Sequence, residues 1–340
     1  MNSKRKNPQI VTIGGGTGAP TIIRSLVSAG YSNIVAVTTA TDSGGRSGMV
    51  RTDERDRVIS IGDWANCLFA LIDSSTSKKD NLQAFLELAT FTDGRKRNLG
   101  YSIFYGLLEM YQNDFIKAQK HLAKMLNIDF RGISLPVSTQ PTNLFFKTKN
   151  GNVYKGEHEL DIYQMSKDTV IEEWFDPEID VLENVGNSII DADYIIYCPG
   201  SLYGSLLANF LPRGMNAALG KSKAIKIFIP NLVSDRNQTH NYNLGKYFEI
   251  LGKYTLLENP FDIAILPDIS RKMFEKNYSE ISKRYADESS HVLDLKPDAE
   301  WMNGHQNLEI IEKDIMIITP HLRLRHDPVK LSNLWKNILK

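Results

Sequence analysis

The chain has 340 residues, of which 42% are hydrophobic and 24% charged, a composition typical of a globular protein with a sizeable buried core. Its 40 basic and 40 acidic side chains cancel, which argues against nucleic acid or an anionic membrane as a partner. Cys67 and Cys198 lie in separate apolar runs, and no apolar run reaches 18 residues. We therefore expect buried thiols in a cytoplasmic protein.

Near its start the chain has a short apolar strand, Ile10–Ile13, that runs into a glycine loop. Between Thr21 and Val27, apolar residues then recur with helical spacing. A glycine loop between a strand and a helix presents backbone N–H groups at the positive end of the helix dipole, which suits a phosphate. No Gly-Lys-Ser/Thr of a Walker A motif follows, and a tight strand-to-helix turn is the alternative interpretation. The loop residues are Gly14, Gly15, Gly16, Thr17 and Gly18.

A second buried strand, 33–39, ends in a second loop of small and polar residues, 41–48. The succession of strand, helix and strand predicts a parallel pair with a right-handed crossover. In such sheets ligands bind beyond the carboxyl ends of the strands, where both loops fall. Asp42 follows the strand directly, a placement suited to a hydroxyl, a ribose or a magnesium ion. Ordinary turn chemistry is the alternative for this residue.

Helical spacing returns over 61–71, and Asp63 lies at the start of this segment, where an N-cap is the simple explanation. Helices are also predicted over 82–88 and 99–110. Short β-like runs then follow, with Asn150-Gly151 as a hairpin signal. We interpret 131–188 as an antiparallel β-rich insertion or extension within a single α/β domain that covers residues 1–340.

Apolar strands that end in polar loops return after residue 194. The last helix begins with Asp327 as N-cap and Pro328 at the first helical position. The pattern predicts an α/β fold with a Rossmann-like, doubly wound, mostly parallel sheet. The predicted strands are 194–198, 224–229, 263–266 and 315–318, and the helices between them are 206–219, 242–251 and 272–285.

Three types of side chain in these loops invite a functional interpretation. Ser201 does not stand in a Gly-x-Ser-x-Gly elbow, so an N-cap or a phosphate donor explains it better than a nucleophile. Asn231 is placed to hydrogen-bond a base or sugar, with an Asx turn as the alternative. The histidines lack the spacing of a helical metal site, and a hydrogen-bonded or exposed ring is the better explanation for each. These histidines are His240, His321 and His326.

Taken in order, the motifs resemble the 2-phospho-L-lactate transferase (CofD-like) family, and more closely its gluconeogenesis-factor (YvcK-like) branch. The resemblance spans nearly the whole chain. The motifs that carry it are Ile13-Gly-Gly-Gly-Thr-Gly18, Asp42 with Gly44-Gly45-x-Ser47-Gly48 and Arg51, Gly62-Asp63-x-x-Asn66-Cys67-Leu68-x-Ala70-Leu71, Gly156-Glu157, Pro199-Gly200-Ser201-Leu202-Tyr203 with Ser205 and Asn209, Asn231-Leu232 with Thr239, and His326-Asp327-Pro328.

This resemblance implies a Rossmann-like fold whose motifs converge on a nucleotide-type ligand. The transferase branch moves a phospholactyl group from a guanosine-diphosphate-linked donor to a deazaflavin acceptor, with magnesium. The gluconeogenesis-factor branch binds UDP-sugars such as UDP-N-acetylglucosamine and affects carbon metabolism and cell shape, without a settled catalytic activity. The glycines of the 44–48 loop favour this second branch.

The chain also departs from the family pattern. Ser43 stands where the branch usually has a second acidic residue, which weakens a magnesium site. Arg46 replaces a small serine and adds a charge that can meet a phosphate. Gly100-Tyr101 replaces a Gly-Asn pair, and residues 234–239 read Ser-Asp-Arg-Asn-Gln-Thr in place of Thr-Gln-Pro-Gly-Glu-Thr. The ligand therefore need not match that of either branch.

We expect a binding protein for a nucleotide or nucleotide sugar, with a role in carbon metabolism or cell-envelope regulation. The alternatives are a phospholactyl transferase, in which Asp42 and Asp63 organise metal and acceptor, and a regulatory protein whose ligand biases a conformation. Magnesium, with Asp42 as its ligand, and homo-oligomerisation stay open. The residues assigned to ligand or phosphate binding are Gly14, Gly15, Gly16, Thr17, Gly18, Gly44, Gly45, Arg46, Ser47, Asn66, Gly200, Ser201, Leu202, Tyr203, Asn231 and Arg325.

Overall fold

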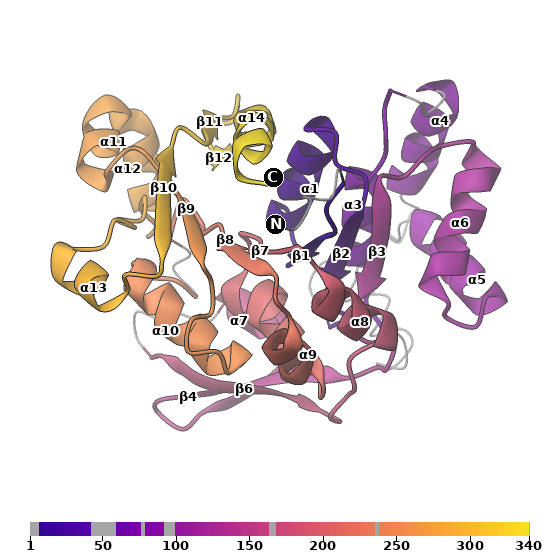
Figure 1. Ribbon diagram of the computed structural model, residues 1–340, viewed down its shortest axis with the longest axis horizontal. Coiled ribbons are helices and arrows are strands. Elements are labelled where there is room, and N and C mark those ends of the chain that lie inside the picture. The colour runs from indigo at the N-terminus through magenta and orange to yellow at the C-terminus, as the bar shows by residue number, and fades with distance from the viewer. Residues whose placement is uncertain are drawn as a thin grey trace, which may run out of the picture.

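The computed structural model describes residues 7–41, 59–75, 79–91, 99–162, 168–234 and 238–339. These residues form a seven-stranded sheet in the order β10-β9-β8-β7-β1-β2-β3, and every neighbouring pair in it is parallel (Figure 1). The predicted α/β fold with a largely parallel sheet is confirmed. The strands of this sheet are β1 (Ile10–Ile13), β2 (Ile34–Thr38), β3 (Gly132–Pro136), β7 (Tyr194–Tyr197), β8 (Ile225–Phe228), β9 (Ile263–Pro267) and β10 (Glu309–Lys313).

Side chains of the central strands alternate between two hydrophobic cores, one on each face of the sheet. Val11 and Ile13 of β1 pack into one core, and Ile10 packs into the other. Strand β7 alternates in the same way, with Ile195 facing the first core and Ile196 the second. Because both faces are covered, these strands read as continuous apolar runs without polar alternation.

Helices cover both faces of the sheet, as Figure 1 shows. Helices α1 and α14 pack together on one face, and α8, α9 and α10 lie on the other. No helix among the described residues combines the length and the apolar character needed to cross a membrane. The helices are α1 (Gly18–Ser28), α3 (Gly62–Ala70), α4 (Lys79–Thr90), α5 (Leu99–Met110), α6 (Phe115–Leu126), α7 (His158–Ile162), α8 (Glu183–Asp191), α9 (Met215–Lys221), α10 (Leu244–Thr255), α11 (Arg271–Asn277), α12 (Ser279–Asp287), α13 (Ala299–Gly304) and α14 (Pro328–Ile338).

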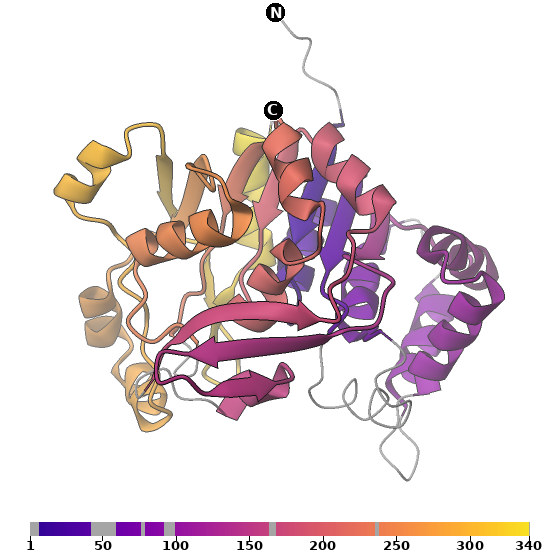
Figure 2. The same ribbon diagram turned by 90° about the horizontal axis from the view of Figure 1, so that it is seen from below.

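A small antiparallel sheet lies below the main body in Figure 1 and faces the viewer in Figure 2, where β4 and β6 run side by side. It consists of β4 (Asn143–Thr148), β5 (Val153–Lys155) and β6 (Val170–Asp176), and the β4–β5 hairpin turns at Gly151, with φ of 87°. The boundaries predicted for this insertion, 131–188, differ from the structure, because β3 pairs parallel with β2.

Three further predictions were wrong in detail. The strand predicted at 315–318 is β11 (Met316–Ile318), which pairs antiparallel with β12 (Leu324–His326) and does not belong to the parallel sheet. The parallel edge strand is β10. Strand β10 was not predicted, because charged residues at both of its ends interrupt the apolar run expected of a strand. The helix predicted over 272–285 is two helices that meet at Tyr278. The helix predicted over 206–219 is a π-helical turn at Leu202–Leu206, a 3₁₀ turn at Leu207–Phe210 and then α9.

At the centre of the sheet, the side on which successive strands are added changes. From β1 the chain moves outward through β2 to β3, and it then returns to form β7 on the other side of β1. The segments that follow these two strands, α1 and the turn at Leu202–Leu206, pack on opposite faces of the sheet, and ligands bind at the carboxyl ends of the strands at such a point. The first glycine loop and Pro199–Ser201 both lie at this point.

Candidate functional site

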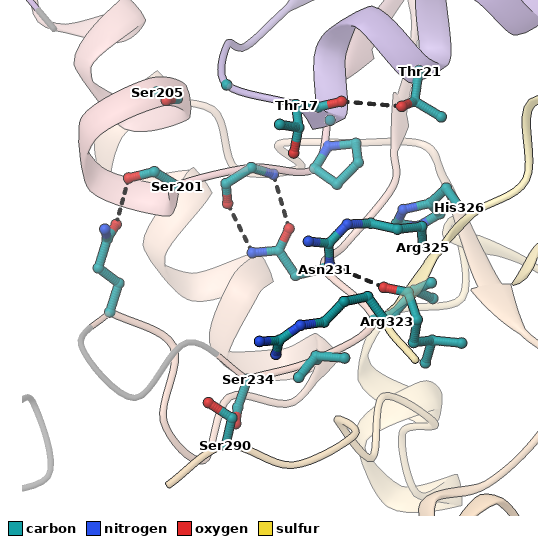
Figure 3. A pocket seen from close by; sticks show the side chains of 18 of the residues that line it. Thr17, Thr21, Ser201, Ser205, Asn231, Ser234, Ser290, Arg323, Arg325 and His326 are labelled. Atoms are coloured by element: carbon teal, nitrogen blue, oxygen red, sulfur yellow. Dashed lines mark hydrogen bonds between the residues drawn. The ribbon is translucent and has the colours of Figure 1, made fainter. Parts of the chain in front are cut away.

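A pocket of about 590 Å³ lies beyond the carboxyl ends of β1, β7 and β8 (Figure 3). The turn around β12 closes its far wall with two arginines and a histidine. Its lining residues are Gly16, Thr17, Gly18, Thr21, Asp63, Glu157, Pro199, Gly200, Ser201, Ser205, Asn231, Leu232, Val233, Ser234, Gln238, Tyr285, Glu288, Ser290, Arg323, Leu324, Arg325 and His326.

The glycine loop packs so closely against its neighbours that side chains would not fit. A Cβ atom on Gly18 would lie 1.9 Å from the Pro199 carbonyl oxygen, and one on Gly15 would lie 1.9 Å from Asp63 Oδ2. Gly16 adopts a left-handed conformation, with φ of 60°. The loops after β1 and β7 therefore form one packed unit, for which glycine is a steric requirement.

Two residues that line the pocket at the start of α1 have backbone N–H groups without a partner among the described residues. The Gly16 amide donates to Asp63 Oδ1 (2.8 Å), and the Ala19 amide donates to the Gly15 carbonyl. The amides of Thr17 and Gly18 make no hydrogen bond within the described residues, and the Thr17 side chain does not cap the helix. Free donors at the positive end of a helix dipole form a site for an anion.

Asp63 binds the glycine loop from α3. The N-cap residue of that helix is Ile61, and Asp63 belongs to its first turn. Its side chain is 7% exposed, and one of its oxygens accepts the Gly16 amide. The simple N-cap explanation is therefore replaced by a contact across 47 residues of sequence.

The loop after β7 is fixed by side-chain hydrogen bonds. Ser201 Oγ accepts from the Gly204 amide (3.2 Å) and donates to Gln238 Oε1 (2.8 Å). Asn231 Oδ1 accepts from the Gly200 amide, and its Nδ2 donates to the Gly200 carbonyl (Figure 3). The Ser201 proton, one N–H of Asn231 and its Oδ1 are thus used within the protein, so both residues organise the pocket wall.

Two arginines next to each other in the far wall differ in their pairing. Arg323 forms a two-pronged ion pair with Glu288, in which Nη2 lies 2.7 Å from Oε1, and this pair lowers the pKa of the Glu288 carboxyl. Arg325 Nη1 donates to the Leu324 carbonyl (3.1 Å), and Arg325 has no carboxylate partner in the described part of the chain. Arg325 therefore brings an uncompensated positive charge to the pocket.

His326 lies beside Arg325 in this wall (Figure 3) and is 8% exposed. Burial, with a smaller contribution from the Arg325 charge, lowers its pKa to about 4. The ring bonds the Pro230 backbone, and its Nε2 has no partner among the described residues. Because the Pro230 carbonyl can only accept, Nδ1 carries the proton, and the ring is neutral at physiological pH.

With this geometry established, known proteins show what the chain is similar to. The sequence model described as 2-phospho-L-lactate transferase CofD matches residues 10–316. The chain belongs to the CofD family.

Within the CofD family the chain is similar to proteins named after gluconeogenesis. It is 29% identical to the gluconeogenesis factor of Bacillus subtilis, over 98% of this chain and 99% of that one. It is 32% identical to a Thermotoga maritima protein named as a candidate gluconeogenesis factor, over 97% of this chain and 99% of that one. The crystal structure of a UPF0052 family protein from Bacillus halodurans has the same fold, with a TM-score of 0.81, 24% identity and coverage of 96% and 99% of the two chains.

The structure brings together several of the residues that the sequence assigned to a ligand and leaves others apart. Leu202 and Tyr203 are 2% and 1% exposed and pack in the core beneath the pocket. Asn66 is exposed on α3 and does not line the pocket. The assigned residues that do line it are Gly16, Thr17, Gly18, Asp63, Gly200, Ser201, Asn231 and Arg325.

The second glycine loop cannot be placed in this site. Asp42, Gly44, Gly45, Arg46 and Ser47 lie outside the residues that the structure describes. The described residues contain no group of three or more His, Cys, Asp or Glu side chains placed to hold a metal ion. Magnesium binding therefore stays a prediction that rests on Asp42.

Gln238 and Arg323 are among the pocket residues that were not assigned from the sequence. Gln238 stands in a polar run without periodicity, so nothing in the sequence distinguished its side chain from a solvated loop. Arg323 alternates with Arg325 around the apolar Leu324, and this alternation was the available signal for a short strand with both arginines on one face.

Proposed function

We propose that the pocket binds a nucleotide or nucleotide sugar through its phosphate groups. The observation that carries the proposal is that one pocket is lined by Thr17 and Gly18, whose amides have no partner among the described residues, and by Arg325, whose guanidinium has no carboxylate partner among them. Helix-terminal N–H groups and a guanidinium are complementary to phosphate oxygens.

The size and lining of the pocket support a ligand larger than a free phosphate. Small-molecule sites commonly enclose roughly 300–1,000 Å³, and this one encloses about 590 Å³. Hydroxyls of Thr21, Ser205 and Ser290 line it as well, and such groups suit the hydroxyls of a ribose or sugar. The relatives named as gluconeogenesis factors support a role in carbon metabolism, with cell-envelope regulation as the further role implied by the resemblance.

The proposal is tested by thermal unfolding with UDP-N-acetylglucosamine, GDP and NAD, with uridine as the phosphate-free control. A ligand at 100 times its dissociation constant is expected to add about 2.7 kcal/mol to the free energy of unfolding. Uridine is expected to add much less, because it offers nothing to the α1 amides or Arg325. Unfolding temperatures that none of the three phosphate ligands changes would refute the proposal.

The match to the transferase family model favours one alternative, a phospholactyl transferase with a deazaflavin acceptor. In this alternative Asp42 and Asp63 organise metal and acceptor, but Asp63 already accepts the Gly16 amide. The alternative predicts phospholactyl transfer that Asp42→Asn abolishes. Nucleotide binding without transfer to the deazaflavin would exclude it and leave the binding proposal intact.

A further inference from the structure

Gln238 lies in the pocket wall with 1% of its surface exposed. Its Oε1 accepts two hydrogen bonds, from Ser201 Oγ (2.8 Å) and from the Tyr203 amide (3.0 Å). A backbone amide can only donate, so the oxygen of the side-chain amide must face Tyr203. The orientation of the Gln238 amide is therefore fixed by its partners.

This orientation directs Nε2 away from both partners. The nitrogen carries two N–H donors and has no hydrogen-bond partner in the described part of the chain. It is also not among the polar side-chain atoms that the fold shields completely from solvent. A ligand oxygen at this point would take the place of water as the acceptor for these donors.

The position of Gln238 identifies the part of the ligand that it meets. Ser201, which Gln238 holds, follows Gly200, and a Cβ atom on Gly200 would lie only 3.2 Å from the Gly15 carbonyl oxygen. Gln238 is therefore connected through Ser201 and Gly200 to the glycine loop, in which the Thr17 and Gly18 amides have no partner among the described residues. An acceptor oxygen in this region belongs to the same anionic group.

We propose that Gln238 Nε2 donates a hydrogen bond to a non-esterified phosphate oxygen of the ligand, while its Oε1 fixes Ser201 and Tyr203. This inference rests on the proposed function for the nucleotide part of the ligand. It makes Gln238 a specificity-determining residue that requires an acceptor at this point of the pocket.

The test is the isosteric variant Gln238→Glu, with UDP and inorganic pyrophosphate as probes in isothermal titration calorimetry. The variant retains an oxygen for Ser201 and Tyr203 but replaces the donor by a negative charge. The dissociation constants for both probes are expected to rise at least tenfold. Gln140→Glu is the matched control, because Gln140 Oε1 also accepts a backbone amide, that of Asp180, and Gln140 is outside the pocket lining.

A pH series separates hydrogen bonding from a general structural effect. Protonation of the new carboxyl restores a donor, so the ratio of the variant and wild-type dissociation constants should fall as the pH falls from 8 to 5. Taking this ratio cancels the pH dependence that arises from ionisable groups common to both proteins and from ionisation of the probe. Among the described residues, the ionisable side chains that line this pocket are Asp63, Glu157, Tyr285, Glu288, Arg323, Arg325 and His326.

The outcomes distinguish this inference from the proposed function. Equal binding of UDP to both proteins, or a ratio that does not change with pH, overturns the role of Gln238 and leaves nucleotide binding intact. Binding of pyrophosphate that the variant loses, with no binding of nucleotides, supports Gln238 and overturns the proposed function. Wild-type protein that binds neither probe overturns both. If Gln238→Glu does not fold, Gln238→Met removes the donor without adding a charge, and unchanged binding overturns the inference.

Discussion

The side-chain amide of Asn231 pairs with both backbone polar groups of Gly200. Nδ2 donates to the Gly200 carbonyl at 2.7 Å, and Oδ1 accepts from the Gly200 amide at 2.8 Å. The loop after β8 thereby holds the loop after β7 in a single orientation. Because the loop after β7 also packs against Gly18, the Asn231 side chain helps to set the shape of the pocket wall.

Asn231→Asp is expected to destabilise the protein by about 1–3 kcal/mol, because a carboxylate oxygen replaces the donor that faces the Gly200 carbonyl. Urea unfolding measures the effect. Asn337→Asp is the control, since Asn337 Nδ2 donates to the Asn333 carbonyl on an exposed part of α14. The control should change stability by less than about 0.5 kcal/mol. Equal stability of Asn231→Asp and wild-type protein would show that the pairing is dispensable.

Gly18→Ala is expected to destabilise the protein by about 1–3 kcal/mol, because its Cβ would meet the Pro199 carbonyl oxygen and force two loops apart. Gly106→Ala is the matched control. Gly106 lies within α5, and a Cβ there meets no atom within 4 Å, so alanine should stabilise this helix by about 0.5–1 kcal/mol. Thermal unfolding of both variants checks the opposite signs, and a neutral Gly18→Ala would contradict the steric requirement.

The sequence was sufficient to predict the central sheet and the glycine loop beside it. Buried parallel strands leave continuous apolar runs, and Ile10–Ile13 and Tyr194–Tyr197 were predicted on that basis and lie next to each other in the sheet. Edge strand β10 was missed because a strand with one free edge tolerates charges such as Glu309 and Lys313. A half-exposed strand therefore lacks the continuous apolar run that identified the central strands of the sheet.

The roles of individual polar residues were harder to predict, because they depend on contacts between distant segments. Asn231 was expected to approach a base or sugar, yet its partner is a backbone 31 residues away. Asp63 resembled an N-cap, yet it holds the Gly16 amide. Neither contact leaves a local pattern, since the partner is a main-chain group that every residue possesses. Arg325 was assigned to the ligand, and the structure adds that it lines the pocket without a carboxylate partner among the described residues.

His326 predicts a pH dependence of stability. Its pKa in the folded protein is about 4, below the ordinary value of about 6.5, so protonation favours the unfolded chain. The associated stability is fully present above pH 6.5 and is lost as the pH falls toward 4, with a loss on the order of 3 kcal/mol. Burial also lowers the pKa of His291, so protonation of this ring likewise favours the unfolded chain.

The comparison with His326→Asn isolates this contribution, because asparagine keeps a donor for the Pro230 carbonyl and does not titrate. Denaturant unfolding at several pH values from 7 to 4 should show wild-type stability falling more steeply than that of the variant. His291→Asn provides the corresponding correction for the second histidine. Parallel curves for wild type and His326→Asn would place the pKa of His326 near its ordinary value.

Arg325→Ala is expected to weaken the binding of nucleoside diphosphates by about 10- to 100-fold, since a charge-assisted hydrogen bond contributes about 1.5–3 kcal/mol. Stability without ligand should change little, because Arg325 has no carboxylate partner in the described part of the chain. Calorimetric titration with UDP measures the loss, and Arg325→Lys should recover part of it by restoring the charge without the planar fork.

Arg213→Ala is the control for this loss of binding, and Arg323→Ala tests the neighbouring ion pair. Arg213→Ala removes an exposed arginine that pairs with Asp180 outside the pocket, and it should bind UDP as wild type does. Arg323→Ala removes the ion pair with Glu288 and returns the pKa of that carboxyl toward its ordinary value, so it should reduce the stability that wild type gains as the pH rises above the lowered Glu288 pKa. If Arg325→Ala binds UDP as tightly as Arg213→Ala does, the free guanidinium has no part in phosphate recognition.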